Sequence, residues 1–382
     1  MAVSYDEQAT DFEFVFRSIK ENLSKIYDYN YEPTTLIADN AAAITNGFEQ
    51  VFSQSFTKRV SCWAHVIRNV DGQLKTIKNE TKRIQIRMDI CNIQSSISKS
   101  LFDRGLELFF NKWKGTDQQL NDFMDYFRKQ WCQKNEGWYE GFCLGIPSQS
   151  NGIESTHRHM KDHDILRSRL AFNQFLNSME GGLVQEWSIA RDPTNPNCKE
   201  YHFDPIIATK DWTDAFKWNA KSHKVVQLGE FYYTSESKPK LTRQECADYL
   251  ESLKTMPWST FDEMVLKINS IFQLKVNKSS WKQTTCTCSI WQKNYKCSHM
   301  IAACCLLQLC DFNTVAMSQP IGMKRRQGRP KQTKSALIRQ PSETVEQNHL
   351  ILSEEEIEVS EPVYARKKRS KPLANKSSKK KK

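Results

Sequence analysis

The segment TTCTCSIWQKNYKCSH, residues 284–299, contains two closely spaced pairs of metal-binding residue types. Cys286 and Cys288 are two positions apart, so on an extended strand their side chains point to the same side. Cys297 and His299 have the same spacing, and they open an apolar run that predicts a buried helix. Three thiolates and one imidazole form the closed tetrahedral set that structural zinc takes. We therefore expect these four residues to bind one Zn²⁺.

The spacing of these four residues resembles the SWIM zinc finger, a Cys-x-Cys and Cys-x-His pattern in a strand–strand–helix arrangement. The flanking residues 291–295 match it as well. The resemblance implies a module over residues 256–312 that binds DNA or another protein. The alternative is a set of buried or unrelated cysteines. Cys304, Cys305 and Cys310 fall on the predicted helix and are expected to pack as apolar side chains.

Length and composition bound the class of protein. With 382 residues and 39% hydrophobic content, the chain can form two or three domains with a core. Twelve cysteines in a chain this long do not indicate a small secreted disulfide framework. No signal peptide is visible, and no segment approaches the ~20 apolar residues of a membrane helix. We expect a reducing compartment and no membrane partner.

The positive charge is concentrated at one end of the chain. Residues 324–382 hold 17 Lys and Arg against 7 Glu, a net charge of +10, out of +11 for the whole chain. This composition cannot bury a core, so residues 313–382 are predicted to be a disordered basic tail.

Short basic motifs in the tail point to DNA and to the nucleus. Residues 327–331 resemble an AT-hook, in which an extended arginine enters a narrow minor groove; here Arg329 and Lys331 would contact DNA. The runs Arg366–Lys371 and Lys379–Lys382 are typical of nuclear-import signals. The alternative is a solvated basic linker without a partner.

The first part of the chain alternates predicted helices and short strands. Apolar residues at helical spacing predict a helix over residues 6–24. A short apolar strand, residues 34–38, ends at Asp39, and a second one ends at Cys62. Residues 66–140 predict three or four packed helices, and further helices are expected over 151–166 and 171–188.

This order of elements resembles the transposase domain of Mutator-like elements over residues 1–312. That family has a ribonuclease-H-like fold in which three carboxylates hold two metal ions for DNA cleavage and strand transfer. The resemblance implies that Asp39 and Glu154 are the second and third carboxylates. It also implies that Cys62 and His65 are the family's Cys-x-x-His pair. From the residues alone, Asp39 could equally cap a turn, Glu154 could face solvent, and the pair could only pack.

The resemblance predicts an α/β plus α fold with a truncated ribonuclease-H-like core. Its expected segments are the partial core (1–65), a helical insertion (66–145), core helices carrying the glutamate (146–190), a connecting region (191–255), the SWIM module (256–312) and the tail (313–382).

The family's first aspartate has no counterpart here, because Asp6 and Asp11 fall on or just before the first predicted helix. We therefore expect a zinc-binding, DNA-associated nuclear protein derived from such a transposase, without catalytic activity as it stands. One alternative is a piece of an active transposase that uses Mg²⁺ or Mn²⁺. Another is a protein-interaction module that acts through the SWIM finger.

Overall fold

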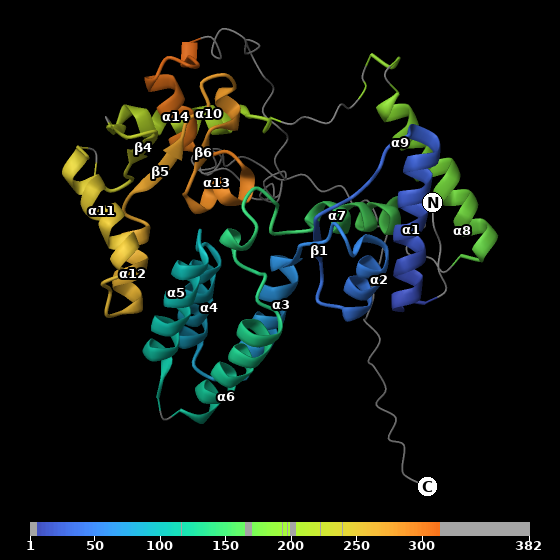
Figure 1. The fold of residues 1–382 in the computed structure, drawn as a ribbon, viewed down its shortest axis with the longest axis horizontal. Helices are drawn as coiled ribbons and strands as arrows, with labels where there is room; N and C mark the ends of the chain where they lie inside the picture. Colours follow the sequence, from blue (N-terminus) through green and yellow to red (C-terminus); the bar gives the residue numbers. More distant parts are fainter. Residues whose placement is uncertain are drawn as a thin grey trace, which may run out of the picture. The chain divides into compact units, whose positions relative to one another are not determined.

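A computed structural model describes residues 6–313 except 116, 165–169, 193, 197, 199–203, 222 and 239. These residues form a helix-dominated α/β fold with two small sheets, one parallel and one antiparallel (Figure 1). Within the described ranges, no helix combines the length and the apolar character that crossing a membrane requires. The predicted tail lies outside the described residues beyond Asn313, and with it Arg329 and Lys331.

The first sheet is a two-stranded parallel pair with a helical crossover. Its elements and the helix before them are α1 (Ala9–Tyr27), β1 (Thr35–Ala38), α2 (Ala42–Phe52) and β2 (Lys58–Ser61). A parallel pair needs a crossover connection, which α2 supplies. Ile37 lies opposite Val60, so both strands end at the same edge. The predicted helix and both predicted strands are confirmed, with ends shifted by a few residues.

Apolar packing holds α1 and α2 against this sheet. Leu36, Phe48 and Phe52 form the buried core of this part, and Phe16 packs against it from α1. The Phe16 and Phe48 rings meet edge to face, with centroids 5.1 Å apart. Where the two helices cross, Gly47 leaves no room for a side chain, because a Cβ would lie 2.6 Å from the Ala9 carbonyl oxygen. Close contact between backbones therefore fixes this crossing.

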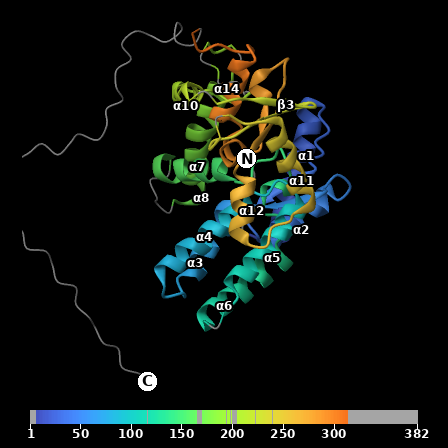
Figure 2. The ribbon, with the colours of Figure 1, turned by 90° about the vertical axis from the view of Figure 1, so that its left-hand side faces the viewer.

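Four helices and two irregular turns build most of the largest core, which Trp258, Phe261 and Met264 complete. They are α3 (Trp63–Leu74), α4 (Glu80–Gln94), α5 (Lys99–Trp113), α6 (Gln118–Phe127), the π-helix Arg128–Lys134 and the 3-10 turn Glu140–Phe142. Asn79, Ser98 and Asp117 cap α4, α5 and α6 by accepting hydrogen bonds from backbone N–H groups. In two views these helices lie side by side (Figures 1 and 2). Their packed interior contains many aromatic side chains, as the sequence predicts, and its largest fully buried members are Trp131, Trp138, Phe109 and Phe127.

A further helical segment follows the loop that ends at Ser150. It comprises α7 (Asn151–His159), the π-turn Met160–Asp164, α8 (Phe172–Ser178), the π-turn Met179–Val184 and α9 (Gln185–Arg191). Glu154 lies in the first turn of α7.

The second sheet is antiparallel and carries residues 284–299, the predicted zinc-finger segment. Its strands are β3 (Val226–Leu228), β4 (Phe231–Thr234), β5 (Phe272–Lys275) and β6 (Thr285–Cys286). The helices of this part are α10 (Thr209–Ala220), α11 (Arg243–Thr255), α12 (Phe261–Ile268), the 3-10 turn Trp281–Gln283, α13 (Ser289–Asn294) and α14 (Ser298–Leu306). The strand order is β3-β4-β5-β6. Helix α14 packs on α10, and both contribute to one buried core (Figure 2).

The zinc-finger segment differs in one element from the expected strand–strand–helix order. Six of the eight residues between the ligand pairs form the short helix α13, where a plain turn was expected. Cys288 starts this helix as its N-cap, and Tyr295 ends it in the left-handed conformation with φ 55°. The first pair therefore spans a strand end and a helix start, and does not sit on one strand.

Candidate metal centre

The four predicted zinc ligands meet in the buried core beside the second sheet. Cys286 ends β6, Cys288 caps α13, and Cys297 caps α14, which carries His299 in its first turn. All four side chains are buried, and one ligand atom from each lies within 4.8 Å of those of the other three. The sequence therefore identified a set of residues that the fold brings together.

Two of the thiols sit at helix starts, where negative charge is favoured. Cys288 Sγ accepts a hydrogen bond from Trp291 N at 3.4 Å, and Cys297 Sγ accepts one from Met300 N at 3.3 Å. Backbone N–H groups at a helix N-terminus, together with the helix dipole, stabilise a thiolate. The local sequence thus orients these two sulfur atoms before any ion is considered.

His299 is held from its far side by a carboxylate. Its Nδ1 lies 4.0 Å from Cys286 Sγ, while its Nε2 lies 3.0 Å from Glu236 Oε2. The same oxygen accepts from Trp218 Nε1 at 3.1 Å. With the proton on Nε2 and shared with Glu236, Nδ1 keeps its lone pair for a metal, an arrangement that metal-binding histidines commonly use.

Sequence reasoning missed Glu236. It precedes His299 by 63 positions and belongs to no short motif. Only the pairing of β4 with β5, which brings the end of β4 toward α14, places it beside the imidazole.

The pKa values of the four side chains shift in different directions. Burial raises the pKa of Cys286 and of Cys297 well above the usual value for a thiol. Hydrogen bonds from Cys286 and Cys297 strongly lower the pKa of Cys288. Burial alone would lower the pKa of His299, but its contacts with Cys288 and Glu236 raise it overall. Cys288 is therefore the most readily ionised of the three thiols.

The donor set fits zinc. A tetrahedral ion with bonds of about 2.3 Å to sulfur holds its sulfur ligands about 3.8 Å apart, and the observed spacing is compatible with this. The remaining cysteines of α14 are not part of the set. Cys304 is buried, with Sγ 3.5 Å from Thr284 Oγ1, and burial raises its pKa to about 11. Cys305 faces Cys310, with 3.3 Å between the sulfur atoms.

A second group of metal-binding residue types forms where β2 ends. One ligand atom from each of Cys62, His65 and Glu154 lies within 4.8 Å of the other two. His65 Nε2 is 3.4 Å from Glu154 Oε1, and Arg68 Nη2 is 3.6 Å from Glu154 Oε2. The Cys-x-x-His pair and the glutamate, more than 80 positions apart in the chain, therefore meet.

Ser150 binds the sulfur of Cys62, which is completely buried. Its backbone N donates to Cys62 Sγ at 3.4 Å, and its hydroxyl donates at 3.1 Å. Burial by itself would raise the pKa of Cys62, but the bonds from Ser150 and His65 lower it overall. The thiol of Cys62 thus ionises more readily than an ordinary cysteine.

Asp39 stands at the same edge of the parallel sheet but outside this group. Its Oδ1 accepts from Ala41 N at 3.1 Å, so the carboxylate stabilises the turn that leads into α2. Among the described residues, Asp39 belongs to no group of three or more candidate ligands. The implied roles of Asp39 and Glu154 as the second and third carboxylates stay a prediction.

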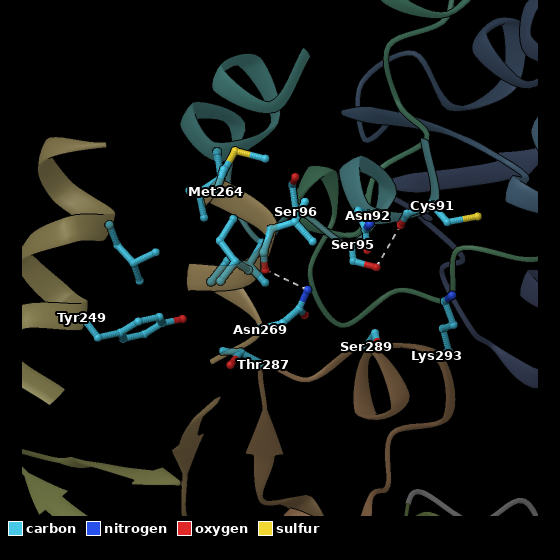
Figure 3. A pocket seen from close by; sticks show the side chains of 15 residues that line it. Cys91, Asn92, Ser95, Ser96, Tyr249, Met264, Asn269, Thr287, Ser289 and Lys293 are labelled. Atoms are coloured by element: carbon cyan, nitrogen blue, oxygen red, sulfur yellow. Dashed lines mark hydrogen bonds between the residues drawn. The ribbon is translucent and has the colours of Figure 1, made fainter. Parts of the chain in front are cut away.

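A cavity of about 230 Å³ lies near the zinc-finger segment, lined by α4, α11, α12 and the start of α13 (Figure 3). Its polar side chains are largely satisfied by their own helices. Ser95 Oγ donates to Cys91 O at 3.2 Å, and Asn269 Nδ2 donates to Val265 O at 3.0 Å. Both hydrogen bonds are made to a carbonyl group of the same helix, four residues earlier.

Comparison with known families agrees with the geometry of the zinc cluster. Residues 279–304 match the SWIM zinc finger, and this span contains all four converging ligands. No curated protein and no solved structure matches the chain. The chain thus contains a SWIM zinc finger.

Proposed function

We propose that this chain is a zinc-binding, DNA-associated nuclear protein derived from a Mutator-like transposase. The observation that carries the proposal is the buried Cys286, Cys288, Cys297 and His299 cluster within the SWIM finger. A closed set of four protein ligands holds zinc for structure and leaves no position for a substrate. The ion would therefore shape a surface, and the activity would be binding.

The charge around the cluster favours a phosphate backbone as the partner. Residues 264–310 contain six lysines and neither aspartate nor glutamate. Lys275, Lys278 and Lys293 are exposed, whereas Lys296 is bound to Asp211 at 2.6 Å. Lysines that replace counterions on DNA supply most of the sequence-independent affinity. The net +10 of residues 324–382 would add to it.

The proposed derivation from a transposase rests on two features. In the parallel unit β1–α2–β2, Asp39 directly follows β1, and Cys62 and His65 follow β2. Helices α3 to α6 then precede Glu154. The same order of motifs carries the resemblance to the transposase domain of Mutator-like elements.

Fluorescence anisotropy with a short DNA duplex tests the DNA association. We expect the affinity of the zinc-loaded chain to fall steeply between 50 and 200 mM salt, by roughly 0.9 log units per phosphate contact per decade of salt. Lys275→Gln, Lys278→Gln and Lys293→Gln combined should reduce this slope, and so should deletion of residues 324–382. A matched control replaces Lys25, Lys99 and Lys254, which are also exposed but lie on α1, α5 and α11.

The same tail deletion tests the location. Removing residues 324–382 should abolish nuclear accumulation and leave the thermal unfolding temperature nearly unchanged. If the chain without residues 324–382 still accumulates in the nucleus, the role given to the tail is wrong.

Protein binding through the zinc finger is the second candidate. Ile290 on α13 and Leu306 on α14 are exposed, at 56% and 46%, beside the cluster. One outcome is that the variant with Lys275, Lys278 and Lys293 replaced by Gln, the control variant and the unaltered chain bind DNA equally well. That result would show that the zinc finger does not contact DNA. It would favour this candidate.

A further inference from the structure

We propose that Cys62, His65 and Glu154 form a second transition-metal site, with Zn²⁺ as the ion that suits its donors. This site is independent of the SWIM cluster and of DNA binding. Nothing in the SWIM match concerns these residues, which lie outside residues 279–304.

The backbone holds the three donors together from two helix starts. Cys62 follows β2 and caps α3, and His65 lies in the first turn of that helix. Glu154 lies in the first turn of α7, whose N-cap is Ser150. Because Ser150 N and Oγ both donate to Cys62 Sγ, the start of α7 is tied to the start of α3. Trp63 N donates to Ser148 O at 2.8 Å and ties them a second time.

Two polar atoms in this group are buried and make no hydrogen bond of normal geometry, namely Nδ1 of His65 and Oε1 of Glu154. Beside Oε1 lies the imidazole of His65, whose Nε2 is 3.4 Å away. A buried polar atom without a hydrogen-bond partner destabilises the fold, so native structures rarely keep two of them side by side. An ion between Glu154 Oε1 and the imidazole would satisfy the carboxylate and fix the ring.

The charges around the group leave a place for a cation. Arg68 contacts Oε2 of Glu154 and so leaves Oε1 to face His65. Arg68 points largely to solvent, with 65% of its side chain exposed, and does not fill the position between the three donors. The other nearby guanidinium, Arg59, is bound to the carbonyl oxygens of Ala38, Asp39 and Val60.

The donor atoms select the kind of ion. One thiolate, one imidazole and one carboxylate are typical zinc ligands, whereas Mg²⁺ takes oxygen ligands almost alone. Three protein ligands leave the fourth tetrahedral position for water or for an oxygen or nitrogen atom of a bound molecule. In this respect the site differs from the closed SWIM set.

Cobalt titration of the full chain tests the proposal, because Co²⁺ replaces Zn²⁺ at such sites and absorbs visible light. We expect the reduced, metal-free chain to bind two Co²⁺ ions. His65→Ala and Glu154→Gln should each bind one, with the SWIM ion retained. His299→Ala should lose the SWIM ion and keep the other. Cys91→Ser, which replaces another partly buried free cysteine, serves as the control and should bind two.

Both test residues are partly exposed, so their variants should fold, and thermal unfolding of each variant verifies this. Zinc content after loading, measured by mass spectrometry, should change in parallel, from two ions to one. A single Co²⁺ in the unaltered chain would overturn the proposal. Two ions in both the His65→Ala and the Glu154→Gln variants would do the same.

Discussion

His299 contacts two different partners through its ring, with Cys286 near Nδ1 and Glu236 near Nε2. A carboxylate on the outer nitrogen fixes the tautomer and makes the inner nitrogen a better metal ligand. Glu236→Ala should therefore weaken zinc binding by about 10- to 100-fold, as loss of such partners usually does. Competition with a chelator of known affinity measures the change.

The control for this variant is Glu230→Ala, which removes an exposed glutamate from the turn between β3 and β4. It changes the net charge by the same amount without touching the cluster. Equal zinc affinity in the two variants would show that Glu236 does not support His299.

Zinc binding should tighten as the pH rises. Burial raises the pKa values of Cys286 and Cys297 well above the usual thiol value, so these two thiols hold their protons near neutral pH when no metal is bound. Zinc requires thiolates, so binding releases those protons. By linkage, the affinity then increases by about two log units per pH unit until the thiols ionise. Calorimetry in buffers of different ionisation enthalpy counts the protons, and release of none would contradict this account.

At the scale of elements, the crossing of α1 and α2 depends on Gly47. A Cβ there would meet the Ala9 carbonyl oxygen and the Phe12 Cβ at 2.6 Å each, so the helices must separate. Gly47→Ala should lower the free energy of unfolding by about 1–3 kcal/mol, the usual effect of overpacking a core.

Gly72→Ala is the matched control, because Gly72 lies in α3 with nothing within 4 Å of the added Cβ. In an exposed helix this change should stabilise by roughly 0.5–1 kcal/mol. Denaturant unfolding compares the two variants. A Gly47→Ala protein as stable as the unaltered chain would mean that α1 does not pack on α2 as described.

Local sequence predicted the elements whose signals are local. The strands at 34–38 and 59–62, the helical segment after them and the apolar helix α14 follow from periodicity and propensity. Helix α13 was missed because its start depends on a thiol cap and its end on Tyr295 in the left-handed conformation. Neither device is a strong signal in a single sequence.

The candidate sites also divide into those with a local sequence signal and those without one. The Cys3His set could be predicted because its four ligands fall within 14 positions. The contact of Glu154 with Cys62 and His65 depends on how the loop ending at Ser150 returns to the start of α3. Long-range returns of this kind leave no spacing pattern, and for the same reason Glu236 was not identified.

At the scale of the whole molecule, a prediction about magnesium-dependent chemistry follows from the missing counterpart of the first aspartate. Among the described residues, the groups of three or more candidate ligands contain one carboxylate at most, that of Glu154. Two-metal cleavage of DNA needs several carboxylates to hold its ions about 3.5–4 Å apart. We expect no nicking of supercoiled plasmid with Mg²⁺ or Mn²⁺. Cleavage that disappears in both Asp39→Ala and Glu154→Ala would establish the chain as an enzyme.

The central claim is that Cys286, Cys288, Cys297 and His299 bind one structural zinc ion. X-ray absorption at the zinc edge tests it most directly, using the zinc-loaded His65→Ala chain so that the SWIM site alone contributes. We predict three sulfur neighbours at about 2.3 Å and one nitrogen neighbour at about 2.0 Å. A first shell with fewer than three sulfur atoms, or one that His299→Ala leaves unchanged, would contradict the account.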